Sequence, residues 1–271
     1  MPEPHSTGDA PVAQRGPLSD VDVAAQAAQA AGDVLLRLRE SAAGAPDLKA
    51  RGDREAQAAI AAVLAELRPG DAVLSEEAAD SAARLSADRV WIVDPLDGTR
   101  EYGEVPRHDW AVHVALWTRE AGDLVTAAVA IPGLGTVLTT DDPRGGAPAP
   151  AVHSGRPRLA VSRSRATETV RVLAEELDLE LVPMGSAGFK ASAVVLGDVE
   201  AYVHTGGQYE WDSAAPVAVA RAAGLHTSRV DGSPLVYNRE DPRLPDLVVC
   251  RPDLASDILT VLKRLHPEEA P

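Results

Sequence analysis

Two aspartates stand three residues apart where an apolar segment of the chain ends, and carboxylates at that spacing can bind a divalent cation. Residues 89–93 (RVWIV) are β-branched and aromatic, which predicts a buried strand. Pro95 cannot donate to a sheet, so we expect strand pairing to stop at Asp94 and the chain to turn, which brings Asp97 back toward Asp94. The two carboxylates and the Leu96 carbonyl are hard oxygen ligands, which suit Mg²⁺ better than a soft metal.

A phosphate site is expected beside these aspartates. Gly98 has no side chain, so its amide can approach a ligand closely. Thr99 is predicted to open a helix, whose free N–H groups and positive dipole end favour an anion. Taken alone, the segment fits an ordinary turn after a strand equally well. The interpretation therefore depends on further carboxylates elsewhere in the chain.

Two other segments supply such carboxylates. Glu76 and Glu77 follow a short apolar run, and Asp212 precedes an Ala-rich helix. Each has a simpler explanation, namely a solvated helix start for the glutamates and an N-cap for Asp212. If the acids converge, two carboxylates about 4 Å apart repel by roughly 4 kcal/mol at an effective dielectric of about 20. Bound divalent ions would then be the natural compensation.

Together these segments resemble the three signature segments of the inositol monophosphatase superfamily, which comprises Mg²⁺-dependent, lithium-sensitive phosphomonoesterases. The segments are Ser75-Glu76-Glu77, Asp94-Pro95-Leu96-Asp97-Gly98-Thr99 and Trp211-Asp212-Ser213-Ala214-Ala215. Their order and spacing agree over most of the chain, from the Asp53 segment to the region of Tyr237. The resemblance implies an αβαβα sandwich and two or three Mg²⁺ ions. The implied metal ligands are Glu76, Asp94, Asp97, Asp212 and the Leu96 carbonyl.

The same resemblance implies roles for the neighbouring residues. The amides of Gly98 and Thr99 would hold phosphate oxygens, and Glu76 would count among the catalytic residues as well as the ligands. Asp53 matches the acid that pairs with Thr99 to orient the attacking water. Asp53 could also be a plain helix N-cap, and the two roles are compatible in one residue.

Smaller features favour a nucleotide as the substrate. Arg100-Glu101-Tyr102 and residues 161–165 (VSRSR) resemble the corresponding runs of CysQ-type nucleotidases, which remove the 3′-phosphate from 3′-phosphoadenosine 5′-phosphate. Gly185 and Ser186 open a predicted helix that would offer amides to an anion. Lys190 in its first turn opposes the helix dipole, so we expect it to bind a second phosphate. The alternative for Lys190 is a solvated surface position.

Several alternatives stay open at this point. An inositol monophosphatase or a fructose-bisphosphatase-like sugar phosphatase is the second enzymatic interpretation, because the metal core is common to all of them. A metal-dependent sensor of phosphorylated metabolites fits less well, because such a protein would be expected to have lost an acid or Thr99. Tyr202 and Tyr209 would either stack a purine or belong to the core. His108, His113 and His204 lack metal-ligand spacing and are expected to be structural or at the pocket rim.

Composition limits the partners of this protein. The chain has 271 residues and a formal net charge of −15, which argues against binding the nucleic acid backbone. A phosphorylated small molecule must therefore be held by local metals and amides. One cysteine, Cys250, excludes an intramolecular disulfide, and no membrane-spanning apolar run is visible, so we expect a cytoplasmic enzyme without a membrane partner. A homodimer is common in the resembled family.

The predicted organisation is an α/β (α+β) protein with two lobes. Residues 1–18 are expected to be a disordered tail, residues 19–150 an α+β metal-binding lobe, and residues 151–271 a second α/β lobe. Helices are expected at about 19–39 and 53–67, before strands at about 72–75, 89–94, 110–117 and 124–131. The Pro- and Gly-rich residues 141–157 are the expected joint between the lobes.

Overall fold

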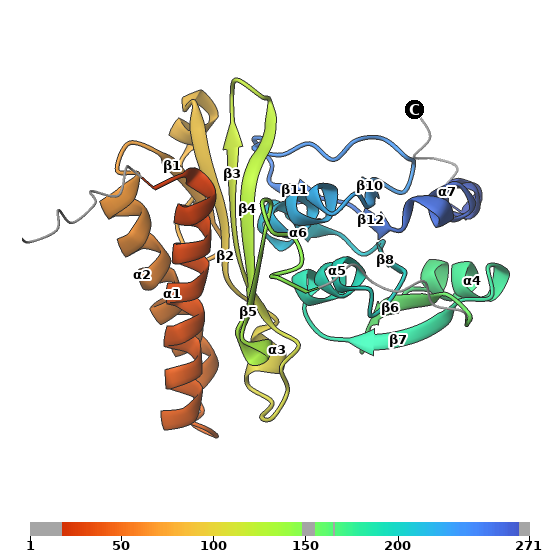
Figure 1. Ribbon diagram of the computed structural model, residues 1–271, viewed down its shortest axis with the longest axis horizontal. Coiled ribbons are helices and arrows are strands. Elements are labelled where there is room, and N and C mark those ends of the chain that lie inside the picture. Colours follow the sequence, from red (N-terminus) through yellow and green to blue (C-terminus); the bar gives the residue numbers. More distant parts are fainter. Residues whose placement is uncertain (1–17, 148–154, 165, 266–271) are drawn as a thin grey trace, which may run out of the picture.

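The computed structural model describes residues 18–147, 155–164 and 166–265, and it arranges them in five layers. Figure 1 shows these layers side by side: a helix pair, a sheet, a second helix pair, a second sheet and a third helix pair. This is the αβαβα sandwich expected from the sequence. The boundary expected at residues 150 and 151 lies outside the described residues, as do residues 1–17 of the tail expected over residues 1–18.

The first sheet has the strand order β1-β2-β3-β4-β5, and its strands pair antiparallel except for β1 with β2. Its strands are β1 (Ala72–Ser75), β2 (Arg89–Asp97), β3 (Ala111–Thr118), β4 (Asp123–Ile131) and β5 (Thr136–Thr139). Helices α1 (Asp20–Ser41) and α2 (Leu48–Leu67) cover one face of this sheet. Alternate residues of β2 serve the two faces: Trp91 and Val93 pack against α1 and α2, whereas Val90 and Ile92 face the opposite core.

The second sheet has the strand order β10-β12-β8-β6-β7. Its strands are β6 (Arg158–Ser162), β7 (Glu180–Met184), β8 (Ala201–His204), β10 (His226–Ser228) and β12 (Leu247–Cys250). Helices α4 (Glu168–Glu176) and α7 (Pro252–Leu265) cover its outer face. A separate two-stranded ribbon pairs β9 (Gln208–Tyr209) with β11 (Arg243–Leu244).

Helices α5 (Ala187–Leu196) and α6 (Glu210–Ala222) form the middle layer and join the two sheets. One hydrophobic cluster contains Ile92 and Val129 of the first sheet, Val194 of α5, Val219 of α6 and Val249 of the second sheet. The starts of both middle helices lie beside the end of β2, where Ser186 and Asp212 meet Asp97. None of the described helices has the length and the apolar composition needed to span a bilayer.

Two boundaries differ from the sequence prediction. Helix α2 begins at Leu48 rather than near Asp53, so Asp53 lies inside the helix and the N-cap explanation for this residue is wrong. Strand β2 does not stop at Asp94 but continues to Asp97 through an irregularity in the pairing with β3, between the pairs Asp94–His113 and Asp97–Ala111. Pro95 lies within this irregularity, where a ladder hydrogen bond is not required of it.

Candidate active site

The turn after β2 is held by local hydrogen bonds and by a glycine conformation. The Leu96 amide donates to Asp94 Oδ1 at 2.9 Å, and the Thr99 hydroxyl donates to the Leu96 carbonyl oxygen at 3.1 Å. Gly98 has a φ of 86°, in the left-handed region, and a Cβ added there would lie 3.0 Å from the Cβ of Ser186. Only glycine fits this position without strain. The helix that follows, α3 (Thr99–Tyr102), is a single short turn.

Three carboxylates converge beside this turn. Asp94, Asp97 and Asp212 each offer one oxygen atom, and these three atoms lie within 4.8 Å of one another. Asp94 is 1% exposed and Asp97 is 8% exposed. Asp212 is the third residue of α6 rather than its N-cap, and its carboxylate accepts a hydrogen bond from the Tyr209 amide at 2.6 Å. Segments more than a hundred residues apart therefore build one acidic cluster.

The acidic cluster carries negative charge that arginine and lysine do not neutralise. Within the described part of the chain, neither Asp94 nor Asp212 forms an ion pair with Arg or Lys. Burial raises the pKa of Asp94 well above its usual range, and the nearby Asp97 carboxylate raises it further. Burial and Asp97 also raise the pKa of Asp212 to about 7. Bound cations would remove this electrostatic cost, and carboxylate oxygens are suitable ligands for a hard divalent ion.

Glu76 lies at the edge of the acidic cluster. It lines the same hollow of about 470 Å³ as the three aspartates, Leu96, Gly98 and Thr99. Loss of hydration raises the pKa of Glu76 to about 7, and the carboxylates of Asp212 and Asp97 add to the shift. The structure therefore brings all the ligands expected from the sequence to one hollow, although Glu76 itself is exposed.

Asp97 is fixed by the start of α5. Its Oδ2 atom accepts hydrogen bonds from the Ser186 hydroxyl at 2.5 Å and the Gly188 amide at 2.6 Å, and its Oδ1 accepts one from the Ala187 amide at 3.2 Å. The Gly185 amide donates to another carboxylate, that of Asp109, at 2.6 Å. The amides that we expected to face a substrate anion are thus occupied by two of the chain's own carboxylates. Gly185 and Ser186 still line the larger cavity described below, and Ser186 also lines the hollow of the acidic cluster.

Lys190 is buried, with 6% of its surface exposed, so the alternative of a solvated surface lysine is wrong. Its ammonium donates to the carbonyl oxygens of Gly185, at 3.2 Å, and of Ser186. It also lies 5.2 Å from the centroid of the Tyr202 ring. Burial lowers the pKa of Lys190, whereas the charge of Asp97 opposes that shift. No carboxylate forms an ion pair with this ammonium among the described residues, so its charge remains directed at the site.

Asp53 and Thr99 meet as the sequence predicted. The Thr99 hydroxyl lies 3.4 Å from Asp53 Oδ1, which brings α2 to the same side of the hollow. Burial raises the pKa of Asp53 to about 6, with a further contribution from the charge of Glu77 and opposition from the hydrogen bond with Thr99. This carboxylate is therefore a better proton acceptor than an ordinary exposed aspartate, and it is still largely ionised at neutral pH.

His113 is a contact of Asp97, whereas the sequence predicted only a structural or pocket-rim position for it. Its ring is fully buried, Nδ1 lies 3.0 Å from the Trp211 carbonyl oxygen, and Nε2 lies 3.4 Å from Asp97 Oδ2. A Cβ on Gly188 would overlap the imidazole, so α5 can approach only because that residue is glycine. The detectable signal was a polar residue at an inward-facing position of an otherwise apolar strand.

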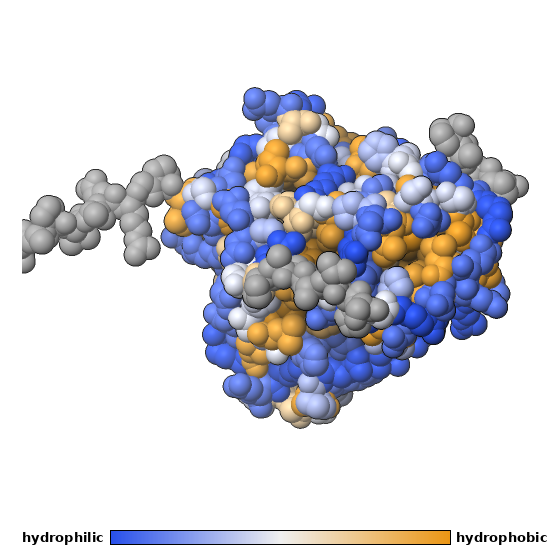
Figure 2. All heavy atoms as spheres, turned by 45° about the vertical axis from the view of Figure 1, so that its right-hand side comes forward, coloured by the Kyte–Doolittle hydropathy of each residue, from blue (hydrophilic) through white to orange (hydrophobic). Residues whose placement is uncertain are grey.

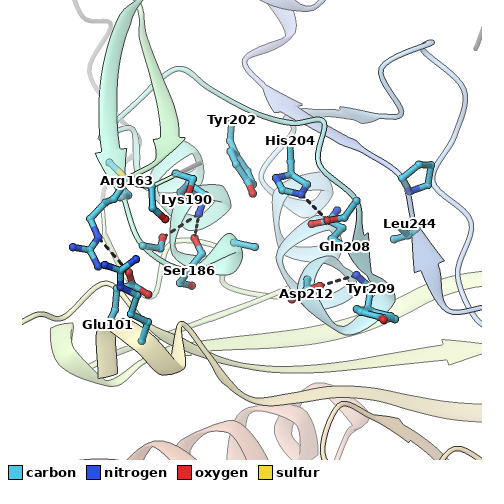
Figure 3. Close-up of a pocket in the computed structure, with 18 of the residues that line it drawn as sticks. Glu101, Arg163, Ser186, Lys190, Tyr202, His204, Gln208, Tyr209, Asp212 and Leu244 are labelled. Atoms are coloured by element: carbon cyan, nitrogen blue, oxygen red, sulfur yellow. Dashed lines mark hydrogen bonds and ion pairs between the residues drawn. The ribbon is translucent and has the colours of Figure 1, made fainter. Parts of the chain in front are cut away.

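A larger cavity of about 770 Å³ opens beside the acidic cluster (Figure 3). It shares part of its wall with the smaller hollow, including Arg100, Glu101, Lys190 and Asp212. Arg163 lies in the same region and forms an ion pair with Glu101 at 2.5 Å. The cavity is large enough for a ligand of nucleotide size. A substrate that places one phosphate at the carboxylates can therefore extend its remaining groups into this cavity.

Comparison with known proteins identifies the same family that the three sequence segments resemble. The model of the inositol monophosphatase family matches residues 18–262. A relative from Mycobacterium leprae named 3′-phosphoadenosine 5′-phosphate phosphatase is 49% identical over 261 residues, which are 92% of this chain and 95% of that protein. An inositol-1-monophosphatase from Mycobacterium tuberculosis, SuhB, is 31% identical over 75% of this chain and 73% of its own length.

Solved structures agree with the described fold. The crystal structure of CysQ from Bacteroides thetaiotaomicron, a bacterial member of the inositol monophosphatase family, has a TM-score of 0.73 and 27% identity, over 86% of this chain and 97% of that chain. These matches confirm the family resemblance read from the three sequence segments.

Proposed function

Because this chain belongs to the inositol monophosphatase family, we propose that it is a metal-dependent phosphatase that removes the 3′-phosphate of 3′-phosphoadenosine 5′-phosphate. The observation that carries this proposal is the acidic cluster of Asp94, Asp97 and Asp212 at the edge of a 770 Å³ cavity. The relative from Mycobacterium leprae, named for this substrate, covers nearly the whole chain and supports the choice. The intact acids and Thr99 count against a sensor without turnover.

The residues of the hollow fit a hard divalent cation. Three largely buried carboxylate oxygens lie within 4.8 Å of one another, and the pKa values of Asp94 and Asp212 are raised in a way that a bound cation would reverse. We propose that Glu76, Asp94, Asp97, Asp212 and the Leu96 carbonyl hold two or three Mg²⁺ ions. When bound, Mg²⁺ would supply positive charge that stabilises the phosphoryl and leaving oxygens and favours ionisation of water.

The attacking water is oriented by Asp53 and Thr99. The Thr99 hydroxyl lies between the Asp53 carboxylate and the Leu96 carbonyl, at 3.4 and 3.1 Å. Asp53, whose pKa is raised to about 6, is ionised at neutral pH and can accept a proton through this pair. The water oxygen bonds to phosphorus, and the bond from phosphorus to the ribose 3′ oxygen breaks. That oxygen then gains a proton and leaves as the hydroxyl of adenosine 5′-monophosphate.

The reacting phosphate is held by the amides of Gly98 and Thr99, and the second phosphate by Lys190. Gly98 lines the hollow of the acidic cluster, whereas Lys190 lines both this hollow and the larger cavity. A buried ammonium without a carboxylate partner in the described structure is suited to bind a second anion, because little water competes for it.

Lys190→Ala tests this assignment. A charge-assisted hydrogen bond is worth roughly 1.5–3 kcal/mol, so we expect kcat/KM for 3′-phosphoadenosine 5′-phosphate to fall by about tenfold or more. The value for adenosine 3′-monophosphate, which lacks the second phosphate, should change much less. Lys263→Ala on α7, an exposed position, is the control. An unchanged preference for the bisphosphate in Lys190→Ala would exclude this role.

Product analysis tests the proposed reaction itself. Incubation of the protein with 3′-phosphoadenosine 5′-phosphate and Mg²⁺ should yield inorganic phosphate and adenosine 5′-monophosphate, and a chelator should stop the reaction. Formation of adenosine 3′-monophosphate instead would mean that the substrate binds in the opposite direction. We extend the sequence prediction of a cytoplasmic enzyme to this proposal, because the single cysteine is buried and forms no disulfide.

A further inference from the structure

The ribbon of β9 and β11 forms one wall of the larger cavity and contributes no carboxylate to the acidic cluster. Tyr209 is paired with Arg243, and Gln208 with Leu244, so each strand of this ribbon contributes two residues to the wall. Figure 3 shows Tyr209 and Leu244 on one side of the cavity and Arg163, Glu101 and Lys190 on the other. The cavity therefore has one end lined by Glu101, Arg163 and Lys190, and another end where Tyr209 and Leu244 lie.

Tyr209 differs from the other aromatic residues of the described chain. Its ring is stacked on Trp211, with centroids 4.6 Å apart and planes 5° from parallel. It is also 38% exposed, and among the described residues it is the only exposed large aromatic side chain. Since Trp211 covers one face of the ring, the exposed area belongs to the opposite face and the edges. Exposure of this apolar ring surface to water is unfavourable, so a flat apolar ligand that covers it would bind favourably.

The second tyrosine of the cavity is not available in the same way. Tyr202 is 2% exposed, and the ammonium of Lys190 lies 5.2 Å above its ring. The structure thereby separates two residues that the sequence left as equal candidates for stacking. Tyr202 belongs to the core and to the surroundings of Lys190, whereas Tyr209 presents its ring to the cavity.

Arg243 completes the wall beside Tyr209. It pairs with Tyr209 across the ribbon, and the nearby Tyr209 side chain raises the pKa of its guanidinium. In the described part of the chain, Arg243 forms no ion pair with a carboxylate. A planar guanidinium next to an aromatic ring provides a second flat surface for a π-system.

We propose that this ribbon binds the base of the nucleotide, with Tyr209 stacked on the purine and the Arg243 guanidinium beside it. The inference rests on the proposed function, and it divides the substrate among three places: the reacting phosphate at the carboxylates, the second phosphate at Lys190, and the base at the ribbon. Tyr209 and Arg243 are then the residues that favour a nucleotide over a cyclitol or sugar phosphate, which offers hydroxyl groups but no flat face. They act on binding and not on the chemical step.

The test compares ligands with and without a base. We would measure inhibition constants for adenosine 5′-monophosphate and for inorganic phosphate, and KM for 3′-phosphoadenosine 5′-phosphate, in wild type, Tyr209→Leu and Tyr209→Phe. Loss of a base–aromatic stack weakens binding by about tenfold. Tyr209→Leu should therefore raise the constants of the two nucleotides by about that factor and leave the constant for phosphate within about twofold. Tyr209→Phe keeps the ring and should bind adenosine 5′-monophosphate far better than Tyr209→Leu.

Specific results would overturn the proposal. An unchanged inhibition constant for adenosine 5′-monophosphate in Tyr209→Leu would do so. Equally weakened binding of adenosine 5′-monophosphate and phosphate would also do so. It would indicate disturbance of Asp212, whose carboxylate accepts a hydrogen bond from the Tyr209 amide. If Tyr209→Leu does not fold, Arg243→Met on the facing strand should weaken adenosine 5′-monophosphate selectively, and no effect there would refute the proposal.

The experiment includes a control variant, and it separates failure of the base site from failure of the proposed phosphatase function. Val236→Ala, at an exposed position that lines neither cavity, should leave all constants unchanged. If wild type binds adenosine 5′-monophosphate through Tyr209 but does not release phosphate from the bisphosphate, the proposed function fails and the base site stands. If wild type releases phosphate but Tyr209→Leu is indistinguishable from it, the reverse holds.

Discussion

Replacing Asp94 by Asn should stabilise the metal-free protein at alkaline pH and abolish its phosphatase activity. Asp94 is 1% exposed, and its carboxylate lies within 4.8 Å of oxygen atoms of Asp97 and Asp212. Asn keeps the size of the side chain and the acceptor for the Leu96 amide, but it carries no charge. The change therefore separates the electrostatic cost of the site from its packing.

The size of the expected gain in stability follows from the distances between the carboxylates and from the direction of their pKa shifts. Two unit charges 4.8 Å apart repel by about 3 kcal/mol at an effective dielectric of 20. Burial raises the pKa of Asp94 well above its usual range, so the native state retains protons that the unfolded state has released. The stability of the metal-free protein should consequently fall as pH rises from about 4 through the raised pKa values. Asn at position 94 removes the largest part of that loss. We therefore expect the free energy of unfolding of the metal-free protein to rise by about 2 kcal/mol near pH 8.

Thermal unfolding of chelator-treated protein measures this gain. For a chain of this size, about 2 kcal/mol corresponds to a rise of roughly 5 °C in Tm near pH 8, with a much smaller difference near pH 5. Added Mg²⁺ should raise the Tm of wild type, because a ligand that binds only the native state stabilises it. The variant should respond weakly to Mg²⁺ and release phosphate at least a hundredfold more slowly, since about 3 kcal/mol of lost transition-state stabilisation suffices for that.

Two results would refute this reasoning. If metal-free Asp94→Asn were less stable than wild type near pH 8, the carboxylates would not repel one another in the folded protein. If the variant kept a tenth of wild-type turnover, Asp94 would not be a ligand of the catalytic cation. Leu181→Ala, at an exposed position on β7, is a control that should shift neither property.

Two further predictions concern the neighbours of this aspartate. The activity of wild type should rise with pH through about 6, because the pKa of Asp53 is raised to about that value and the ionised form is the proton acceptor. In Asp53→Asn, kcat should be low at every pH and should lack this rise. A pH profile of kcat identical to that of wild type would contradict the role of Asp53. Gly98→Ala should lower Tm, because the left-handed φ of 86° and a contact of 3.0 Å with Ser186 together cost roughly 1–2 kcal/mol; a Tm equal to that of wild type would mean that the turn tolerates a side chain.

The acidic residues of the site were predictable because each stands at the end of a recognisable element. Asp94 and Asp97 follow a strand with alternating buried faces, and Asp212 begins an Ala-rich helix. Their convergence followed from the resemblance of three segments, since electrostatics alone gives no reason for acids to meet. The geometry then places their oxygen atoms within 4.8 Å.

Other features depended on contacts between distant segments. The sequence does not indicate that Asp97 would occupy the amides at the start of α5, because an amide can bind a substrate anion or a protein carboxylate equally well. The ribbon was missed because β9 and β11 have two residues each and lie next to Pro, Gly and charged residues. Helix α2 was predicted five residues too short, since Gly52 is a weak helix former and separates residues 48–51, which are good helix formers, from the rest of the helix.

The surface outside the site does not indicate which molecule this protein binds. Figure 2 shows one face of the molecule, which is largely hydrophilic and has apolar residues in separate patches. With a net charge of −15, the protein repels anions over most of its surface. Attraction of a phosphorylated substrate therefore depends on the local charges of the site, namely Lys190, Arg100 and the proposed cations.

The most direct test of the central claim is the rate of phosphate release from three substrates, with Mg²⁺ and with a chelator. The substrates are 3′-phosphoadenosine 5′-phosphate, inositol 1-phosphate and fructose 1,6-bisphosphate, compared as kcat/KM. We predict Mg²⁺-dependent release with a large preference for the nucleotide, because only the nucleotide fills the carboxylate hollow, the Lys190 position and the cavity together. Comparable rates on all three would contradict the proposed specificity, and no release from any would contradict the proposed activity.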